Sequence, residues 1–237
     1  MDGVKLMNRT DTKFIFNINQ FAMIMKGLEK DYRILEMKGK RQSHYETLYY
    51  DTGKFNLYIQ HQNGKLNRYK IRHRTYVDSD NGYLEVKFKT NKGRTIKTRI
   101  SKHDPPFVWD EDSSTFLINS LPFDPATLVP VIWVNYTRQT LVNKTGAERL
   151  TLDLNLEFVK DKTKKKLDCL VIAEVKQEKR KPSPFMKVMK KFHIRKGSLS
   201  KYCMGMALTT SDVKQNNFKP KLRTLKNKMY ANYPTNC

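Results

Sequence analysis

Two stretches decide the fold: residues 68–76 read RYKIRHRTY, and residues 84–89 read LEVKFK. Successive side chains of a β-strand point to opposite faces of the sheet, so each stretch separates its charged residues from its apolar ones. One face carries Arg68, Lys70, Arg72 and Arg74 in the first stretch, and Glu85, Lys87 and Lys89 in the second. The sequences Asp80-Asn81-Gly82 and Asn91-Lys92-Gly93 contain residues that accept positive φ, which predicts hairpins between neighbouring antiparallel strands.

The same alternation recurs in three further stretches, residues 95–101, 149–158 and 170–177. Their polar faces carry, in turn, Lys97 and Arg99; Arg149, Thr151, Asp153, Asn155 and Glu157; and Glu174 and Lys176. The opposite face of each stretch is apolar. The pattern therefore predicts a series of strands that each have one charged face.

A strand with one solvated face and one buried face explains any single stretch. The whole set is harder to explain in this way, because like charges directly opposite on neighbouring strands destabilise a sheet by up to about 1 kcal/mol per pair. Crowded cations are tolerated where an anion lies among them. A closed or nearly closed barrel, apolar outside and charged inside, would hold phosphate in its lumen, and arginine donates to two phosphate oxygens at once.

Carboxylates share these faces with the cations, namely Glu85, Asp153, Glu157 and Glu174. They could bind Mg²⁺ or Mn²⁺, hard cations that take oxygen ligands and bridge to phosphates. They could also form salt bridges with the lysines and arginines of the same face. The residues alone leave both interpretations open.

The remainder of the chain predicts an α+β domain dominated by antiparallel sheet. Helices are expected at residues 18–30, 54–62, 111–120 and 184–192, and further strands at 45–51 and 131–142. The expected architecture is an antiparallel β tunnel with helices packed outside. One such domain would cover residues 1–208, and the basic segment 209–237, which has few apolar residues, would be a peripheral or mobile tail.

Composition limits the function. The 237 residues carry a formal net charge of +23, so the partner is expected to be a polyanion: nucleic acid, an anionic membrane surface or a phosphate-rich substrate. No apolar run approaches the roughly 20 residues of a membrane span, and no signal-peptide pattern opens the chain. The three cysteines lack metal-site spacing, and the phosphate-loop and GxGxxG patterns do not occur. A reduced cytosolic setting is the simplest expectation.

Short motifs recur in a fixed order along the chain. They are residues 9–14 (RTDTKF), 47–52 (TLYYDT), 70–76 (KIRHRTY), 84–89 (LEVKFK), 135–138 (NYTR), 149–153 (RLTLD), 173–176 (AEVK) and finally Phe192 with 200–202 (SKY). In this order the chain resembles the VTC-type polyphosphate polymerase domain, a member of the triphosphate tunnel metalloenzyme (CYTH-like) superfamily. The superfamily usually opens with ExExK, whereas Arg9 and Asp11 stand at the two acidic positions here. The loss of the first carboxylate favours the VTC branch over the triphosphatases.

The resemblance implies transfer of the γ-phosphoryl group of ATP onto a growing polyphosphate chain, with release of ADP and with Mn²⁺ or Mg²⁺ as cofactor. Under this hypothesis the triphosphate and the product chain would be held by Lys13, Arg72, Arg74, Lys87, Arg138 and Arg149. Glu174 would bind the metal, and Ser200 and Lys201 would close on a phosphate at one mouth of a tunnel open at both ends. The second choices along the lumen are Lys70, Lys89, Lys97, Arg99 and Lys176.

Two other functions stay open from the sequence: a tunnel triphosphatase for inorganic or nucleoside triphosphates, and a non-catalytic binder of polyphosphate or nucleic acid. Specific nucleic-acid recognition is not expected, since no recognition-helix pattern or aromatic RNA platform is present. The expected location is the cytoplasm, at the inner face of a membrane if a separate membrane protein receives the product.

Overall fold

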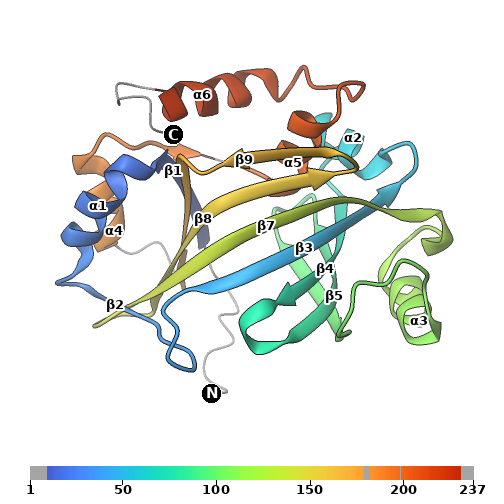
Figure 1. The fold of residues 1–237 in the computed structure, drawn as a ribbon, viewed down its shortest axis with the longest axis horizontal. Helices are drawn as coiled ribbons and strands as arrows, with labels where there is room; N and C mark the ends of the chain where they lie inside the picture. Colours follow the sequence, from blue (N-terminus) through green and yellow to red (C-terminus); the bar gives the residue numbers. More distant parts are fainter. Residues whose placement is uncertain (1–9, 179–181, 198, 231–237) are drawn as a thin grey trace.

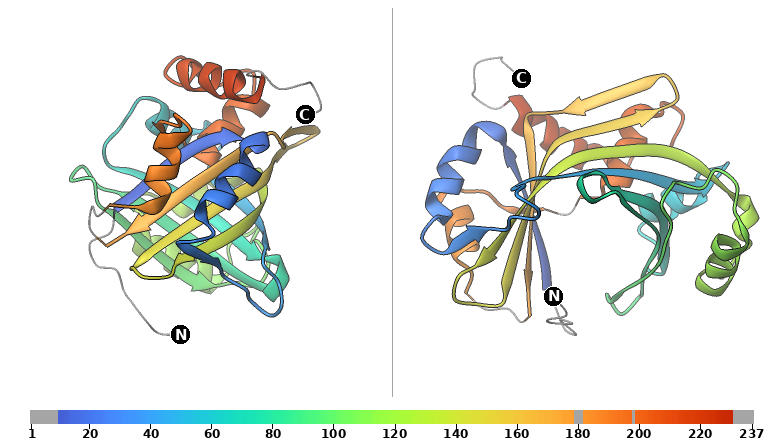
Figure 2. Two further views of the ribbon diagram at one scale, coloured as in Figure 1. Left: turned by 90° about the vertical axis from the view of Figure 1, so that its left-hand side faces the viewer. Right: turned by 60° about the horizontal axis from the view of Figure 1, so that its bottom comes forward.

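The computed structural model describes residues 10–178, 182–197 and 199–230. Within these residues the strands form one antiparallel sheet of eleven, which curls into a nearly closed tunnel (Figures 1 and 2). The strands are β1 (Thr10–Asn17), β2 (Tyr32–Ile34), β3 (Ser43–Thr52), β4 (Arg68–Tyr76), β5 (Asn81–Lys89), β6 (Thr95–Ser101), β7 (Leu128–Asn143), β8 (Glu148–Lys160), β9 (Thr163–Leu167), β10 (Leu170–Gln177) and β11 (Lys196–Gly197). Their order is β11-β1-β10-β8-β7-β3-β4-β5-β6, with β2 beside β7 and β9 beside β8.

The charged stretches pair as the alternation predicts. In the β4–β5 hairpin, Arg72 lies opposite Glu85 and Lys70 opposite Lys87, and β6 continues the ladder with Lys97 opposite Lys87. Strand β5 requires a glycine at position 82, since a Cβ atom there would overlap the carbonyl oxygens of Lys102 and His103, which follow β6. The charged faces of these three strands therefore form one continuous surface.

Most helices cover the outside of the sheet, as expected. They are α1 (Phe21–Leu28), α2 (Asn56–Gln62), α3 (Glu111–Ser120), α4 (Pro184–Lys191), α5 (Lys201–Thr209) and α6 (Lys219–Tyr230), with the short 3₁₀ turns η1 (Ile18–Gln20), η2 (Val77–Ser79) and η3 (Pro125–Thr127). Helices α1 and α4 pack Ile24 and Phe185 against the outer side chains of β1, β8 and β10, including Phe14. Helix α3 places Leu117 against Leu84 of β5.

Strand β8 departs from uniform alternation. Its pairing with β7 shifts between Asn135 and Thr137, and Asn155 has a left-handed backbone with φ +51°. A bulge of this kind puts one extra residue into one strand and reverses which face the later side chains take. Glu157 therefore lies on the outer surface, where it pairs with Lys164 at 2.7 Å. The prediction that Glu157 shares the charged inner face is wrong for this reason.

Helix α5 is the exception to the external arrangement. Beyond the bulge, Phe158 joins Ile132 of β7 on the face that packs against α5. Gly205 of α5 sits so close that a Cβ atom would lie 2.6 Å from Phe158 and 2.8 Å from Ile132. The apolar body of α5 thus covers the inner face at one end of the sheet, which differs from a tunnel left open at both ends.

The C-terminal segment, expected to be peripheral or mobile, forms helix α6 on the periphery. Leu225 is buried, and the Lys228 ammonium donates to the Ile15 carbonyl oxygen of β1 at 2.8 Å. Through residue 230 the segment is therefore packed rather than free, and residues 231–237 and the motif residue Arg9 lie outside the described residues. Among the described residues, no helix is long and apolar enough to cross a membrane.

Candidate active site

Glu85, Asp153 and Glu174 lie on the inner face, and each of these carboxylates is shared by two cations. The first is Glu85 of β5, which is fully buried. Arg72 donates from Nε to its Oε2 at 2.7 Å, and Lys97 of β6 pairs with its other oxygen. Burial opposes ionisation of Glu85, but Arg72, Arg74 and Lys97 outweigh it and lower the pKa of the carboxyl to about 2. The group is therefore a permanent anion within a cationic wall.

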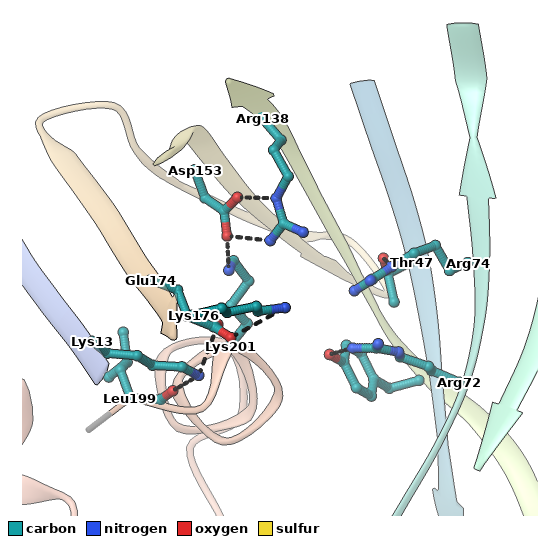
Figure 3. Close-up of polar contacts among 11 residues, drawn as sticks. Lys13, Thr47, Arg72, Arg74, Arg138, Asp153, Glu174, Lys176, Leu199 and Lys201 are labelled. Carbon is teal, nitrogen blue, oxygen red and sulfur yellow. Dashed lines mark hydrogen bonds and ion pairs between the residues drawn. The ribbon is translucent and has the colours of Figure 1, made fainter. Parts of the chain in front are cut away.

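The second carboxylate is Asp153 of β8, on the opposite wall (Figure 3). Arg138 of β7 donates to both of its oxygens, at 2.6 Å and 2.9 Å, in the fork geometry that suits a carboxylate. Lys201, at the start of α5, pairs with the same carboxylate. Burial works against the anion, yet Arg138 and Lys201 hold the pKa of Asp153 well below its usual range.

The third carboxylate is Glu174 of β10, which is half-buried. Its oxygens lie 3.7 Å from the Lys13 ammonium and 3.4 Å from that of Lys176. Lys13 also donates to the Leu199 carbonyl oxygen at 3.3 Å. These cations, with Lys201, outweigh burial and lower the pKa of Glu174 to about 2. Figure 3 shows this group and the arginines of β4 on opposite sides of the lumen.

Tyrosine rings support the arginines between these groups. Tyr45 and Tyr136 are stacked with centroids 5.1 Å apart. The Arg138 guanidinium lies 5.1 Å from the Tyr45 centroid, and the Lys201 ammonium lies 4.6 Å from that of Tyr136. Arg74 lies 5.5 Å from the Tyr45 centroid. Cations over aromatic faces gain electrostatic stabilisation, so the rings orient the charged groups without neutralising them.

Two pairs of directly opposite residues in the β4–β5 ladder are formed by cations alone. Lys70 lies opposite Lys87, and Arg68 lies opposite Lys89. A cavity of about 360 Å³ opens here, lined by these four residues together with Lys13 and Glu174, and with others. Withdrawal of the Lys87 ammonium from bulk water, aided by nearby Arg72 and Lys70, lowers its pKa to about 7. Withdrawal from bulk water also lowers the pKa of Lys70.

The comparisons with known proteins agree with this arrangement. The family model of the VTC domain matches residues 8–108 and 118–210, which is most of the chain. The chain belongs to the VTC domain family. No curated protein matches it in sequence. The expectation of a VTC-type domain with a triphosphate-tunnel fold is thus confirmed.

Solved structures are similar to this VTC domain at low sequence identity. A putative adenylyl cyclase from Hippeastrum, HpAC1, whose description reports a dominant triphosphatase activity, is 12% identical with a TM-score of 0.50, over 85% of this chain and 97% of that one. A putative adenylate cyclase from Vibrio parahaemolyticus is 11% identical, with a TM-score of 0.49, over 83% and 98%. The PH1819 protein from Pyrococcus horikoshii is 13% identical, with a TM-score of 0.46, over 84% and 99%.

The VTC domain brings most of the predicted residues together, in two groups. Those that line the cavity are Lys13, Lys70, Lys87, Lys89, Glu174 and Ser200. Those that form or adjoin the ion pairs beside it are Arg72, Arg74, Lys97, Arg138, Lys176 and Lys201. Ser200 also caps α5, since its hydroxyl accepts from the Cys203 amide at 3.3 Å.

Two predicted residues stand apart from these groups. Arg149 is exposed and lies opposite Lys176, two residues along the ladder from the pair of Glu174 and Thr151. This position is towards the end of β8 that is far from α5. Arg99 is also exposed, and its guanidinium lies 4.3 Å from the Tyr83 ring centroid on the edge strand β6. Both follow the inner-face alternation, but neither lines the cavity.

The tyrosines are the site residues that sequence reasoning missed. Tyr45 and Tyr49 alternate with outer-facing residues of β3, and Tyr136 is two residues before Arg138. The Tyr49 hydroxyl accepts from Arg72 at 3.2 Å. Their place on the same alternation as the arginines was a usable signal, but aromatic side chains in a strand more often indicate an apolar face.

The inner carboxylates suit a divalent ion that is bound partly by the substrate. Across the parts of the chain that the structure describes, no three His, Cys, Asp or Glu side chains gather as a ready metal cage. Mg²⁺ is usually held by one or two carboxylates together with substrate phosphates. Glu174 meets that requirement because it lines the cavity and lies 3.7 Å and 3.4 Å from its two cations, whereas Glu85 and Asp153 are buried in closer ion pairs. The residues present therefore suit a metal that binds together with a triphosphate.

Proposed function

We propose that this VTC domain transfers the γ-phosphoryl group of ATP onto a growing inorganic polyphosphate chain and releases ADP, with Mn²⁺ or Mg²⁺ as cofactor. The supporting observation is the surplus of cations around one cavity. Glu85, Asp153 and Glu174 are each shared by two cations. In the adjoining β4–β5 pairs, Lys70 lies opposite Lys87 and Arg68 opposite Lys89, with no carboxylate directly across the ladder. A linear phosphate chain is the ligand that neutralises such a surface.

The two walls would hold the phosphates from opposite sides. Arg72 and Arg74 of β4 face the lumen from one side, and Arg138 and Lys201 from the other (Figure 3). Phosphoryl transfer depends mainly on positioning and on stabilising the negative charge of the equatorial oxygens. The ion pairs with Asp153 and Glu85 fix the guanidinium groups before the substrate binds, so little reorganisation is needed during the reaction.

Glu174 would hold the divalent ion on the side of the cavity that Lys13 also lines. When bound, the ion neutralises part of the charge on the triphosphate and polarises its oxygens. Lys13 and Lys176 would then be released from Glu174 to contact phosphate. Lys87 would regain its full positive charge next to the anion, because a neighbouring negative charge favours the ammonium.

The test incubates the protein with ATP and Mn²⁺ and measures ADP, free phosphate and polyphosphate together. The expected result is ADP with polymer. Free phosphate without polymer would instead identify a triphosphatase, as reported for the Hippeastrum protein. Binding of polyphosphate without turnover would identify a non-catalytic binder.

The metal assignment is tested by Glu174→Gln, with Glu157→Gln as the matched control on the outer surface. We expect Glu174→Gln to lower turnover by about 10²-fold or more, the usual effect of removing one electrostatic group from a phosphoryl-transfer or oxyanion site. The control should turn over at the wild-type rate. Unchanged activity in Glu174→Gln would refute the role of this carboxylate.

A further inference from the structure

The segment after the VTC match crosses the mouth of the cavity. The family model ends at residue 210, and the chain then continues through residue 230 as part of the described structure. At one end, the Tyr58 hydroxyl of α2 donates to the Lys214 carbonyl oxygen at 2.9 Å. At the other end, the Lys228 ammonium donates to the Ile15 carbonyl oxygen at 2.8 Å. The segment thus connects α2, between β3 and β4, with β1, which lies on the other side of the tunnel opening (Figures 1 and 2).

The orientation of α6 is set by its apolar residues. Leu222, Leu225 and Met229 recur at helical spacing and pack into the core beneath the helix. This brings Lys221 and Leu222 into the lining of the phosphate cavity, together with Phe218 just before the helix. Lys221 and Lys226 are both exposed, but Lys226 does not line the cavity. One turn of α6 is therefore part of the cavity wall.

The cavity that α6 helps to line has an excess of positive charge, since six lysine and arginine side chains line it together with two carboxylates, Asp11 and Glu174. The rungs Lys70–Lys87 and Arg68–Lys89 line it, and like charges directly opposite in a sheet are destabilising. Further inside, Glu85 and Asp153 compensate the arginines. The tunnel therefore has two sections, an inner one balanced by carboxylates and an outer one under α6 where cations predominate.

We infer that Lys221 is an additional phosphate-binding residue, and that the outer section beneath α6 receives the part of a polyphosphate chain that extends beyond the inner section. This inference rests on the proposed function. A short triphosphate would be held by the inner groups and by Glu174. Only a longer chain would reach Lys221 while its end occupies the inner section.

The first experiment measures equilibrium binding of tripolyphosphate and of long-chain polyphosphate to the full chain, by titration calorimetry. Lys221→Gln should weaken binding of the long chain about three- to fivefold, the range of an exposed ion pair, and change tripolyphosphate binding little. Lys226→Gln removes the same charge from the same helix outside the cavity and should leave both affinities near wild type. Equal effects of the two substitutions on the long chain would show only a general electrostatic attraction and would overturn the inference.

The second experiment compares lysine acetylation with and without each ligand, read by mass spectrometry. Long-chain polyphosphate should protect Lys221 and leave Lys226 reactive, whereas tripolyphosphate should protect neither. Persistent reactivity of Lys221 under saturating long-chain polyphosphate would overturn the inference while leaving the proposed function intact. Failure of the wild-type protein to bind either ligand would instead contradict the proposed function.

Discussion

Removal of the negative charge of Glu85 should destabilise the free protein and strengthen its binding of polyanions. The Glu85 side chain is fully buried, and it pairs with Arg72, which is mostly buried, and with Lys97, which is partly exposed. Breaking a buried ion pair by removing one partner is costly because it leaves the other charge buried. Glu85→Gln keeps the shape of the side chain, so the change isolates the charge.

The magnitude follows from the pKa of the carboxyl. Arg72, Arg74 and Lys97 lower it from 4.5 to about 2. At 1.36 kcal/mol for each tenfold change in the ionisation constant, this corresponds to about 3 kcal/mol of stability. Because the folded pKa is depressed, this contribution is complete above about pH 5 and is lost as the pH falls towards 2. At pH 7 the free energy of unfolding of Glu85→Gln should therefore be about 3 kcal/mol lower than that of wild type, which corresponds to a Tm lower by roughly 6–12 °C for a domain of this size.

The assay is thermal unfolding at pH 7 with and without tripolyphosphate. The Tm difference between Glu85→Gln and wild type should narrow in the presence of the ligand, because the anion replaces the missing negative charge and binds more tightly. The control Glu157→Gln removes a carboxylate from the outer surface, where its exposed pair with Lys164 is worth at most about 1 kcal/mol. The reasoning is refuted if Glu85→Gln has the same Tm as wild type in the absence of ligand, or if tripolyphosphate leaves the difference in Tm unchanged.

Two further predictions concern the lysines and the packing of α5. Burial and neighbouring cations lower the pKa of Lys87 to about 7, while the unfolded chain keeps the ordinary value of 10.5. The unfolded state then binds more protons between these values, so stability of the ligand-free protein should rise with pH from about 7 to about 10. Binding of polyphosphate at pH 7 should raise the pKa of Lys87 and take up protons, so the calorimetric heat of binding should depend on the ionisation enthalpy of the buffer. A heat that is the same in all buffers would contradict this prediction. Gly205→Ala should lower the free energy of unfolding by about 1–3 kcal/mol, because the added methyl group would overlap Phe158 and Ile132 unless both side chains shift. An unchanged midpoint of urea unfolding would contradict this prediction and show that both side chains shift freely.

The strands and their faces were predictable because alternation is a local property of the chain. Strands β4, β5 and β6 are antiparallel neighbours, as the turn residues indicate, and their outer apolar residues are covered by helices. What could not be predicted was where the alternation changes. The β8 bulge depends on a left-handed conformation at Asn155, a residue type that also occurs in regular strands. The assignment of Glu157 failed at that residue.

The position of α5 was also beyond reach from the sequence. Its apolar residues are almost continuous from Tyr202 to Leu208, which indicates a buried helix but not the face of the sheet that it covers. The inner face becomes available because the bulge turns Leu156 and Phe158 inward, and because Gly205 lets the helix backbone approach them closely. The tyrosines of the lumen were missed for a related reason, since their role depends on arginines from other strands that lie over their rings.

The arrangement around Asp51 connects a buried motif residue with the charged groups of the lumen. Asp51 is fully buried and accepts hydrogen bonds from the amides of Leu57 and Tyr58, at 2.9 Å and 2.8 Å, and from the Tyr202 hydroxyl. One carboxylate therefore fixes the start of α2 and the first turn of α5. That turn carries Lys201, whose ammonium pairs with Asp153. The position of the inner cation Lys201 thus depends on Asp51, a carboxylate that is buried between α2 and α5. Two kinds of motif residue, the inner cations and this buried carboxylate, therefore act together.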